Sequence, residues 1–74
     1  MGYEMVNGKK IRITGTPGHR NYSYGHAIAY ISKTPLGYFI ELATRRKMAT
    51  TQPKKYKTKN AAIRAAKIMV AKRG

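Results

Sequence analysis

The clearest pattern in the first two-thirds of the chain is an alternation of polar and apolar residues with a period of two. In the first alternating segment, Ile11 and Ile13 fall on one face, as is typical of a strand that buries one side. Pro53 closes the last segment and confines it to the edge of a sheet. The sequence therefore predicts strands at 9–14, 26–32 and 38–43, and a short fourth strand at 48–52.

Turn-forming residues separate these strands. Thr34-Pro35-Leu36-Gly37 places Pro where φ is fixed and Gly where φ can become positive, which predicts a hairpin between the second and third strands. Residues 15–25 contain three Gly together with Pro, Asn and Ser, and predict a loop. Residues 1–8 show no clear period and predict a flexible arm.

The pattern changes to a helical period over residues 59–73. Thr58 or Asn60 can cap the start of this helix. Six apolar residues fall within an arc of about 160°, which forms one apolar face: Ala62, Ile63, Ala65, Ala66, Met69 and Val70. The order of the elements predicts a single domain, 1–74, of the α+β class, with a small antiparallel three- to four-stranded sheet packed against one C-terminal helix.

The amino-acid composition argues against several classes of catalytic and metal site. The 74 residues include 16 Lys and Arg and 2 acidic residues, so the formal charge is 16 − 2 = +14. The acidic residues are Glu4 and Glu41, and Asp and Cys are absent, so the usual carboxylate pairs, catalytic triads and thiolate sites are missing. The two histidines, His19 and His26, are too few for a typical zinc site. We expect no enzymatic activity, no metal and no cofactor.

The charge also points to a class of partner. A domain at +14 repels itself, and a polyanion or an acidic protein relieves that repulsion. The longest apolar run, residues 27–31, is far below the ~20 residues of a membrane span. We expect a soluble, monomeric, cytoplasmic protein that does not bind membranes. Its expected partners are nucleic acid or an acidic protein that handles nucleic acid.

Basic residues are concentrated around the short fourth strand, where seven cations lie within residues 45–59. This basic patch is placed to contact phosphates or an acidic protein surface, although edge lysines also protect sheets from aggregation. Tyr22 and Tyr24, in the expected loop, are placed to stack on bases or to pack on their own sheet. The candidate contact residues are Arg20, Tyr22, Tyr24, Arg45, Arg46, Lys47, Lys54, Lys55 and Lys57.

Two short motifs occur in the second half of the chain. One is the strand Met48-Ala49-Thr50-Thr51-Gln52, and the other is the helix start Tyr56-Lys57-Thr58-Lys59-Asn60-Ala61-Ala62. With the preceding strand, they resemble the ββα unit of the YegP-like family over residues 38–70. The resemblance implies a ββα fold and carries no function. The chain departs from that family at 45–47, where an Asn-Gly turn is usual.

The small size, the basicity and the lack of enzymatic residues are similar to those of small bacteriophage proteins that take over a host cell. At this class level, the resemblance implies a non-enzymatic transcription regulator in the cytoplasm of a bacterial host. Such a regulator binds bacterial RNA polymerase and inhibits initiation or alters termination. The alternative is a module that binds DNA or RNA directly through the basic patch.

Overall fold

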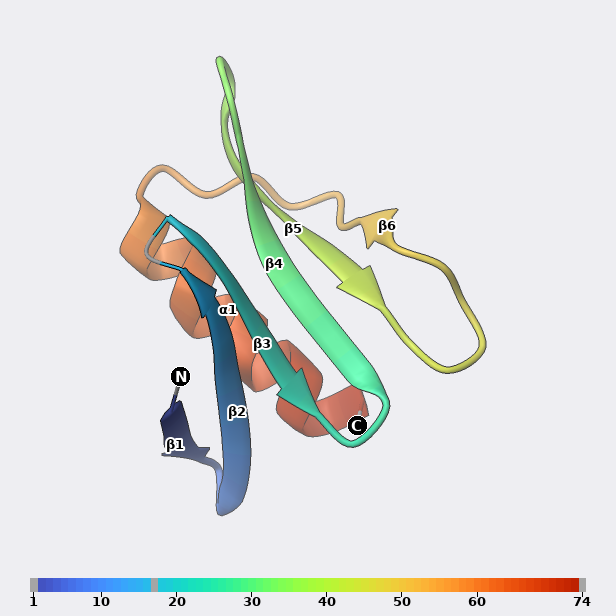
Figure 1. Ribbon diagram of the computed structural model, residues 1–74. Coiled ribbons are helices and arrows are strands. Elements are labelled where there is room, and N and C mark those ends of the chain that lie inside the picture. Colours follow the sequence, from blue (N-terminus) through green and yellow to red (C-terminus); the bar gives the residue numbers. More distant parts are fainter. Residues whose placement is uncertain (1, 17, 74) are drawn as a thin grey trace.

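The computed structural model describes residues 2–16 and 18–73, which form a curled antiparallel sheet with one helix packed behind it in Figure 1. The strands lie side by side in the order in which they occur in the sequence. They are β1 (Gly2–Val6), β2 (Lys9–Thr16), β3 (His19–Tyr24), β4 (Ala27–Thr34), β5 (Gly37–Ala43) and β6 (Thr50–Thr51), followed by helix α1 (Lys59–Arg73). The α+β class is confirmed, but the sheet has six strands and not three to four.

Two predictions about irregular segments are wrong. The flexible arm expected at 1–8 contains strand β1, which pairs with β2; Met1 lies outside the described residues. The loop expected at 15–25 is mostly strand, because β2 runs on to Thr16 and β3 pairs with both β2 and β4. Gly15, inside β2, has a φ of 94°, and Gly18, just before β3, has a φ of 91°, a backbone conformation that glycine adopts readily.

The hairpin expected at residues 34–37 is confirmed. Thr34 and Gly37 are paired across β4 and β5, and Pro35 and Leu36 form the tip. The Thr34 hydroxyl donates to the carbonyl of Gly37 at 3.0 Å and accepts from the N–H of Leu36 at 3.2 Å. The Thr34 side chain therefore forms hydrogen bonds with two backbone groups of the turn that would otherwise bond only to water.

The core lies between the inner face of the sheet and α1. Alternation along β4 turns Ala27 and Ala29 inward, and on α1 the buried Ala62 and Ala66 are equally small. Small side chains on both surfaces allow the helix to pack closely against the strands. The larger buried side chains that fill the remaining space are Ile11, Tyr22, Ile40, Leu42 and Val70.

Helix α1 begins and ends as the sequence predicts. The hydroxyl of Thr58 accepts from the N–H of Ala61 at 3.2 Å, which makes Thr58 the capping residue.

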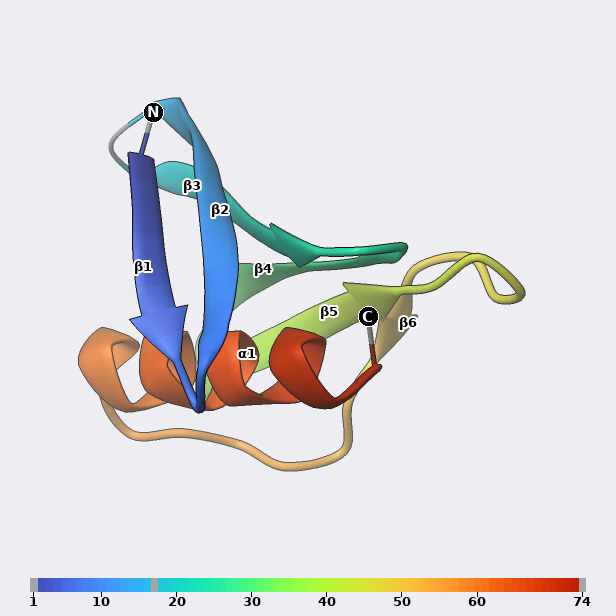
Figure 2. The same cartoon turned by 90° about the horizontal axis from the view of Figure 1, so that it is seen from below.

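Figure 2 shows β1 and β2 rising steeply away from the helix because the sheet is strongly curled. An ion pair of 2.7 Å between Lys67 and Glu4 links α1 to β1. In the described part of the chain, no helix has the length and apolarity needed to cross a membrane.

Candidate functional site

The outer face of the sheet, turned away from α1, carries exposed rings beside cations. Residues that pair across strands share a face, so Tyr3 and Arg12 lie together on it. Tyr30 lies farther along the same face, between Asn21 of β3 and Glu41 of β5. The exposed fraction is 57% for Tyr3 and 38% for Tyr30. The ammonium of Lys10 lies 4.4 Å from the centre of the Tyr3 ring, which is a cation–π contact.

Both acidic residues are engaged within the protein. The carboxylate of Glu4 faces α1, where it is paired with Lys67. The carboxylate of Glu41 accepts from the hydroxyl of Thr51, whose Oγ1 lies 2.8 and 2.6 Å from the two carboxylate oxygens. Lys67 offsets the charge of Glu4, whereas Glu41 keeps its negative charge beside Tyr30 on the outer face.

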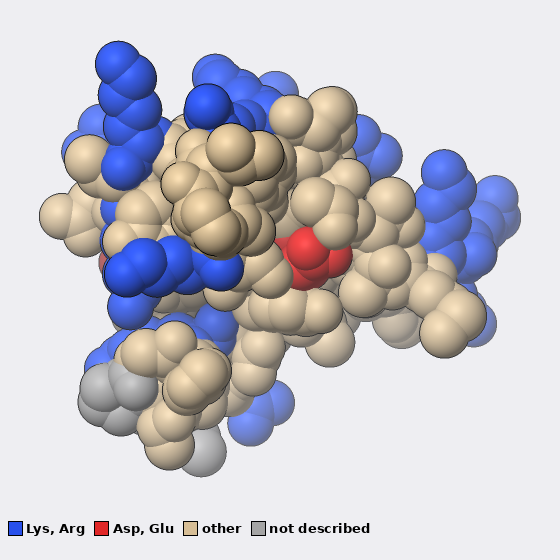
Figure 3. All heavy atoms as spheres, turned by 90° about the horizontal axis from the view of Figure 1, so that it is seen from above, with Lys and Arg blue, Asp and Glu red and all other residues tan. Residues whose placement is uncertain are grey.

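The basic patch expected at 45–59 is divided between two ends of β5. Arg45, Arg46 and Lys47 are exposed in the loop that follows β5. The exposed lysines 54, 55 and 57 lie beside the opposite end of the strand, where Tyr56 pairs with Tyr38. Figure 3 shows Lys and Arg side chains gathered in several separate groups on the face that it displays. The expected basic patch is therefore two separate groups of cations, one near each end of β5.

A cavity of about 450 Å³ opens on the inner face, beside the first turns of α1. Alternation along β4 brings Ile31 and then Lys33 to the face that Ala29 occupies closer to the core. The first turns of α1 reach this end of the sheet with Lys59 and Ile63. The cavity is lined by Gly18, Arg20, Tyr22, Ile31, Lys33, Tyr38, Lys59 and Ile63.

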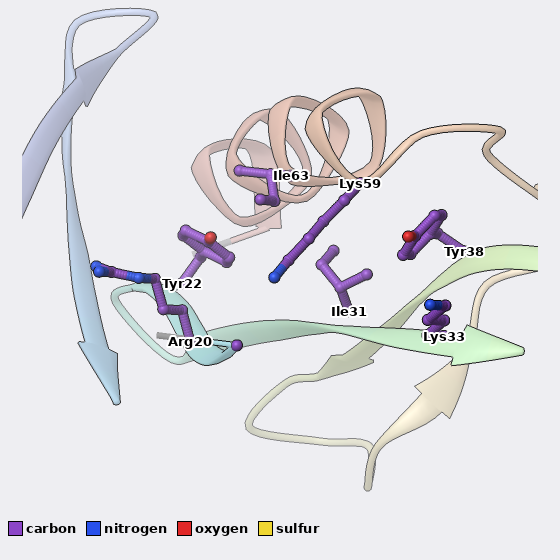
Figure 4. A pocket seen from close by; sticks show the side chains of 8 residues that line it. Arg20, Tyr22, Ile31, Lys33, Tyr38, Lys59 and Ile63 are labelled. Atoms are coloured by element: carbon purple, nitrogen blue, oxygen red, sulfur yellow. The ribbon is translucent and has the colours of Figure 1, made fainter. Parts of the chain in front are cut away.

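Figure 4 shows how these side chains are arranged. Lys59 reaches from the first turn of α1 into the space between Tyr22 and Ile31, and the hydroxyl of Tyr38 faces the same space. The guanidinium of Arg20 extends toward β2 at the mouth. Three cationic side chains from three different elements therefore surround one cavity, and neither of the two acidic residues lines it.

The residues expected to form a contact loop are placed differently. Tyr22 is a core residue with 3% of its surface exposed, so it offers no free ring face for a base to stack on. Tyr24 is half-buried, with the ammonium of Lys9 lying 5.5 Å from its ring centre. Only Arg20 remains exposed, and it lines the cavity with Tyr22. Sequence reasoning missed Lys33 and Lys59, although the alternation of β4 already places Lys33 on the inner face.

Comparisons with protein-family models, with curated proteins and with solved structures find no match to this chain. Within residues 2–16 and 18–73, no group of three or more His, Cys, Asp or Glu side chains is arranged to hold a metal ion. The outer face and the inner cavity are therefore the features from which a function is inferred.

Proposed function

We propose that the protein binds single-stranded nucleic acid on the outer face of its sheet. The observation that carries this proposal is the exposed ring of Tyr3 beside Lys10 and Arg12, with a second exposed ring, Tyr30, farther along the same face. Proteins that bind single strands combine these two features, since bases stack on aromatic rings while cations follow the phosphates. A single strand fits better than a duplex because its bases are free to stack.

The distribution of charge supports the same proposal. Cations in several separate groups attract a flexible polyanion from many directions, and the strand then settles where rings are exposed. A partner that is a folded protein would instead meet one compact basic surface with apolar anchors. Tyr22 and Tyr24, the aromatic residues among the candidate contact residues, are buried or half-buried and do not form such a surface.

The test is fluorescence anisotropy with short labelled single strands of DNA and RNA, and with a duplex of the same length. Replacing both outer tyrosines by alanine, Tyr3→Ala and Tyr30→Ala, should weaken single-strand binding tenfold or more, because stacking contributes about 1–3 kcal/mol per base. The matched control, Tyr3→Phe with Tyr30→Phe, keeps the rings and should bind like the parent protein. Tighter binding of the duplex, with no effect of the alanines, would contradict the proposal.

A second candidate function, docking on bacterial RNA polymerase, is favoured by the loop between β5 and β6. Met48 in this loop is 89% exposed and directly follows Arg45, Arg46 and Lys47. Met and Arg are enriched at the cores of protein interfaces, so an apolar side chain beside three cations suits an acidic protein surface. In this second candidate function, the protein is a transcription regulator that inhibits initiation or alters termination.

Surface-plasmon kinetics with purified, nuclease-treated polymerase test the second candidate. Met48→Ser should speed dissociation at least tenfold, because apolar anchors control dissociation more than cations do. Leu36→Ser, at the tip of the β4–β5 hairpin, is the control, since Leu36 is also exposed but lies outside the loop. If the parent protein does not bind purified polymerase, this candidate is rejected.

A further inference from the structure

The inner cavity combines positive charge with apolar walls in a way that a surface of solvated lysines does not. Lys33 comes from β4, Lys59 from α1 and Arg20 from β3, and all three border the same space of about 450 Å³. The rings of Tyr22 and Tyr38 and the side chains of Ile31 and Ile63 line the rest of it. Binding pockets for small ligands have this size and this mixture of apolar walls with a few convergent polar groups.

The start of α1 adds a second, independent observation. Lys59 is the first residue of the helix, and the first turn contains no acidic side chain. The N-terminus of a helix carries a partial positive charge, so a lysine there is unfavourable and an anion is favourable. The side chain of Lys59 borders the cavity, so a lysine that the helix dipole does not favour adds to the positive charge there.

We infer that this cavity binds a nucleotide through its phosphate. Lys59 and Lys33 supply the positive charge for the phosphate, and the base lies against Tyr38, Ile31 and Ile63. Arg20 at the mouth is free to contact the sugar or a second phosphate. The nucleotide is either free in solution or the phosphorylated end of a strand, since both carry the same chemistry. The inference concerns the inner face and does not rest on binding at the outer face.

Adenosine 5′-monophosphate is the probe, compared with adenosine and with inorganic phosphate at equal ionic strength. Titration calorimetry should show saturable binding of the monophosphate, and the melting temperature should rise by several degrees at saturation. Adenosine lacks the charge and inorganic phosphate lacks the base, so each should bind at least tenfold more weakly. If the three compounds, or a matched amount of sodium chloride, shift the melting temperature equally, the inference is overturned.

A pair of variants with the same net charge separates the cavity from general attraction by a basic protein. Lys33→Gln with Lys59→Gln should reduce affinity for the monophosphate tenfold or more. Lys55→Gln with Lys57→Gln, which removes two exposed cations outside the cavity, should change it less than twofold. Equal losses in the two double variants would show non-specific attraction and overturn the inference.

The Lys59→Glu variant should change stability and ligand binding in opposite directions. An acidic residue in the first turn complements the helix dipole, so the melting temperature without ligand should rise by a few degrees. The same variant should lose the further rise that the monophosphate gives the parent protein. A variant that keeps the full response to the monophosphate would overturn the inference.

Short 5′-phosphorylated and 5′-hydroxyl oligonucleotides of one sequence distinguish the two sources of the nucleotide. Tighter binding of the phosphorylated strand, abolished by Lys33→Gln with Lys59→Gln, supports the end of a strand. Binding of the free monophosphate with no difference between the strands supports a free nucleotide. Equal binding of both strands without binding of the monophosphate leaves the outer-face proposal standing and overturns this inference alone.

Discussion

At the scale of single residues, the close contact of α1 with the sheet depends on alanine. Ala66 is fully buried in the core, whereas Ala61 is exposed on the same helix. Ala66→Leu should lower the free energy of unfolding by about 1–3 kcal/mol, because three added carbon atoms have no space between helix and strands. Ala61→Leu is the matched control and should change it by less than about 0.5 kcal/mol. Urea denaturation measures both, and equal effects would show that the contact is loose.

Alternation explains which strands could be predicted from single residues. Apart from Lys33, the inward residues of β4 and β5 are apolar, so the alternation predicts both strands and the hairpin between them. In β1 the pattern is reversed: Tyr3 and Met5 face solvent, and Glu4 faces inward, where it meets Lys67. A charged inward residue whose partner lies 63 positions away has no local signature. In β3 the charged Arg20 occupies an inward position and obscures the alternation.

At the scale of elements, the loop between β5 and β6 is held by its backbone. The N–H of Thr44 donates to the carbonyl of Lys47 at 3.0 Å, and the N–H of Lys47 donates back at 3.3 Å. Replacing Arg45, Arg46 and Lys47 by serine should therefore leave the free energy of unfolding unchanged or raise it, since like charges are removed. Binding of the polyanionic or acidic partner should fall at least tenfold. A parallel loss of stability would mean that these side chains hold the loop.

The cavity is also a feature of the elements, because it forms where strands and helix meet. It could not be predicted from single residues. Its position depends on where α1 begins relative to the inward positions at the end of β4. Both element boundaries were close to their predicted places, but the sequence alone does not fix how a helix lies across a sheet. The candidate residues therefore included Arg20 and Tyr22 and omitted Lys33 and Lys59.

At the scale of the whole molecule, the net charge of +14 governs association. If about six cations contact phosphates of a single strand, a fourfold rise in salt should weaken binding by about 300-fold, because counterions are no longer released as favourably. Binding titrations at two salt concentrations measure how steeply the affinity falls as salt rises. A nearly flat response would exclude phosphate contacts as the main source of affinity and would favour the polymerase candidate.

The order of the strands also has a consequence for how the chain folds. Each strand pairs only with its neighbours in the sequence, so every hairpin can close locally without a long loop search. The apolar inner face of the sheet is buried against the helix, however, and the helix follows all the strands in the chain. During synthesis, hairpins should therefore form and dissolve repeatedly while the chain emerges from the ribosome. The native state should become stable in one step, when residues 59–73 are released and dock.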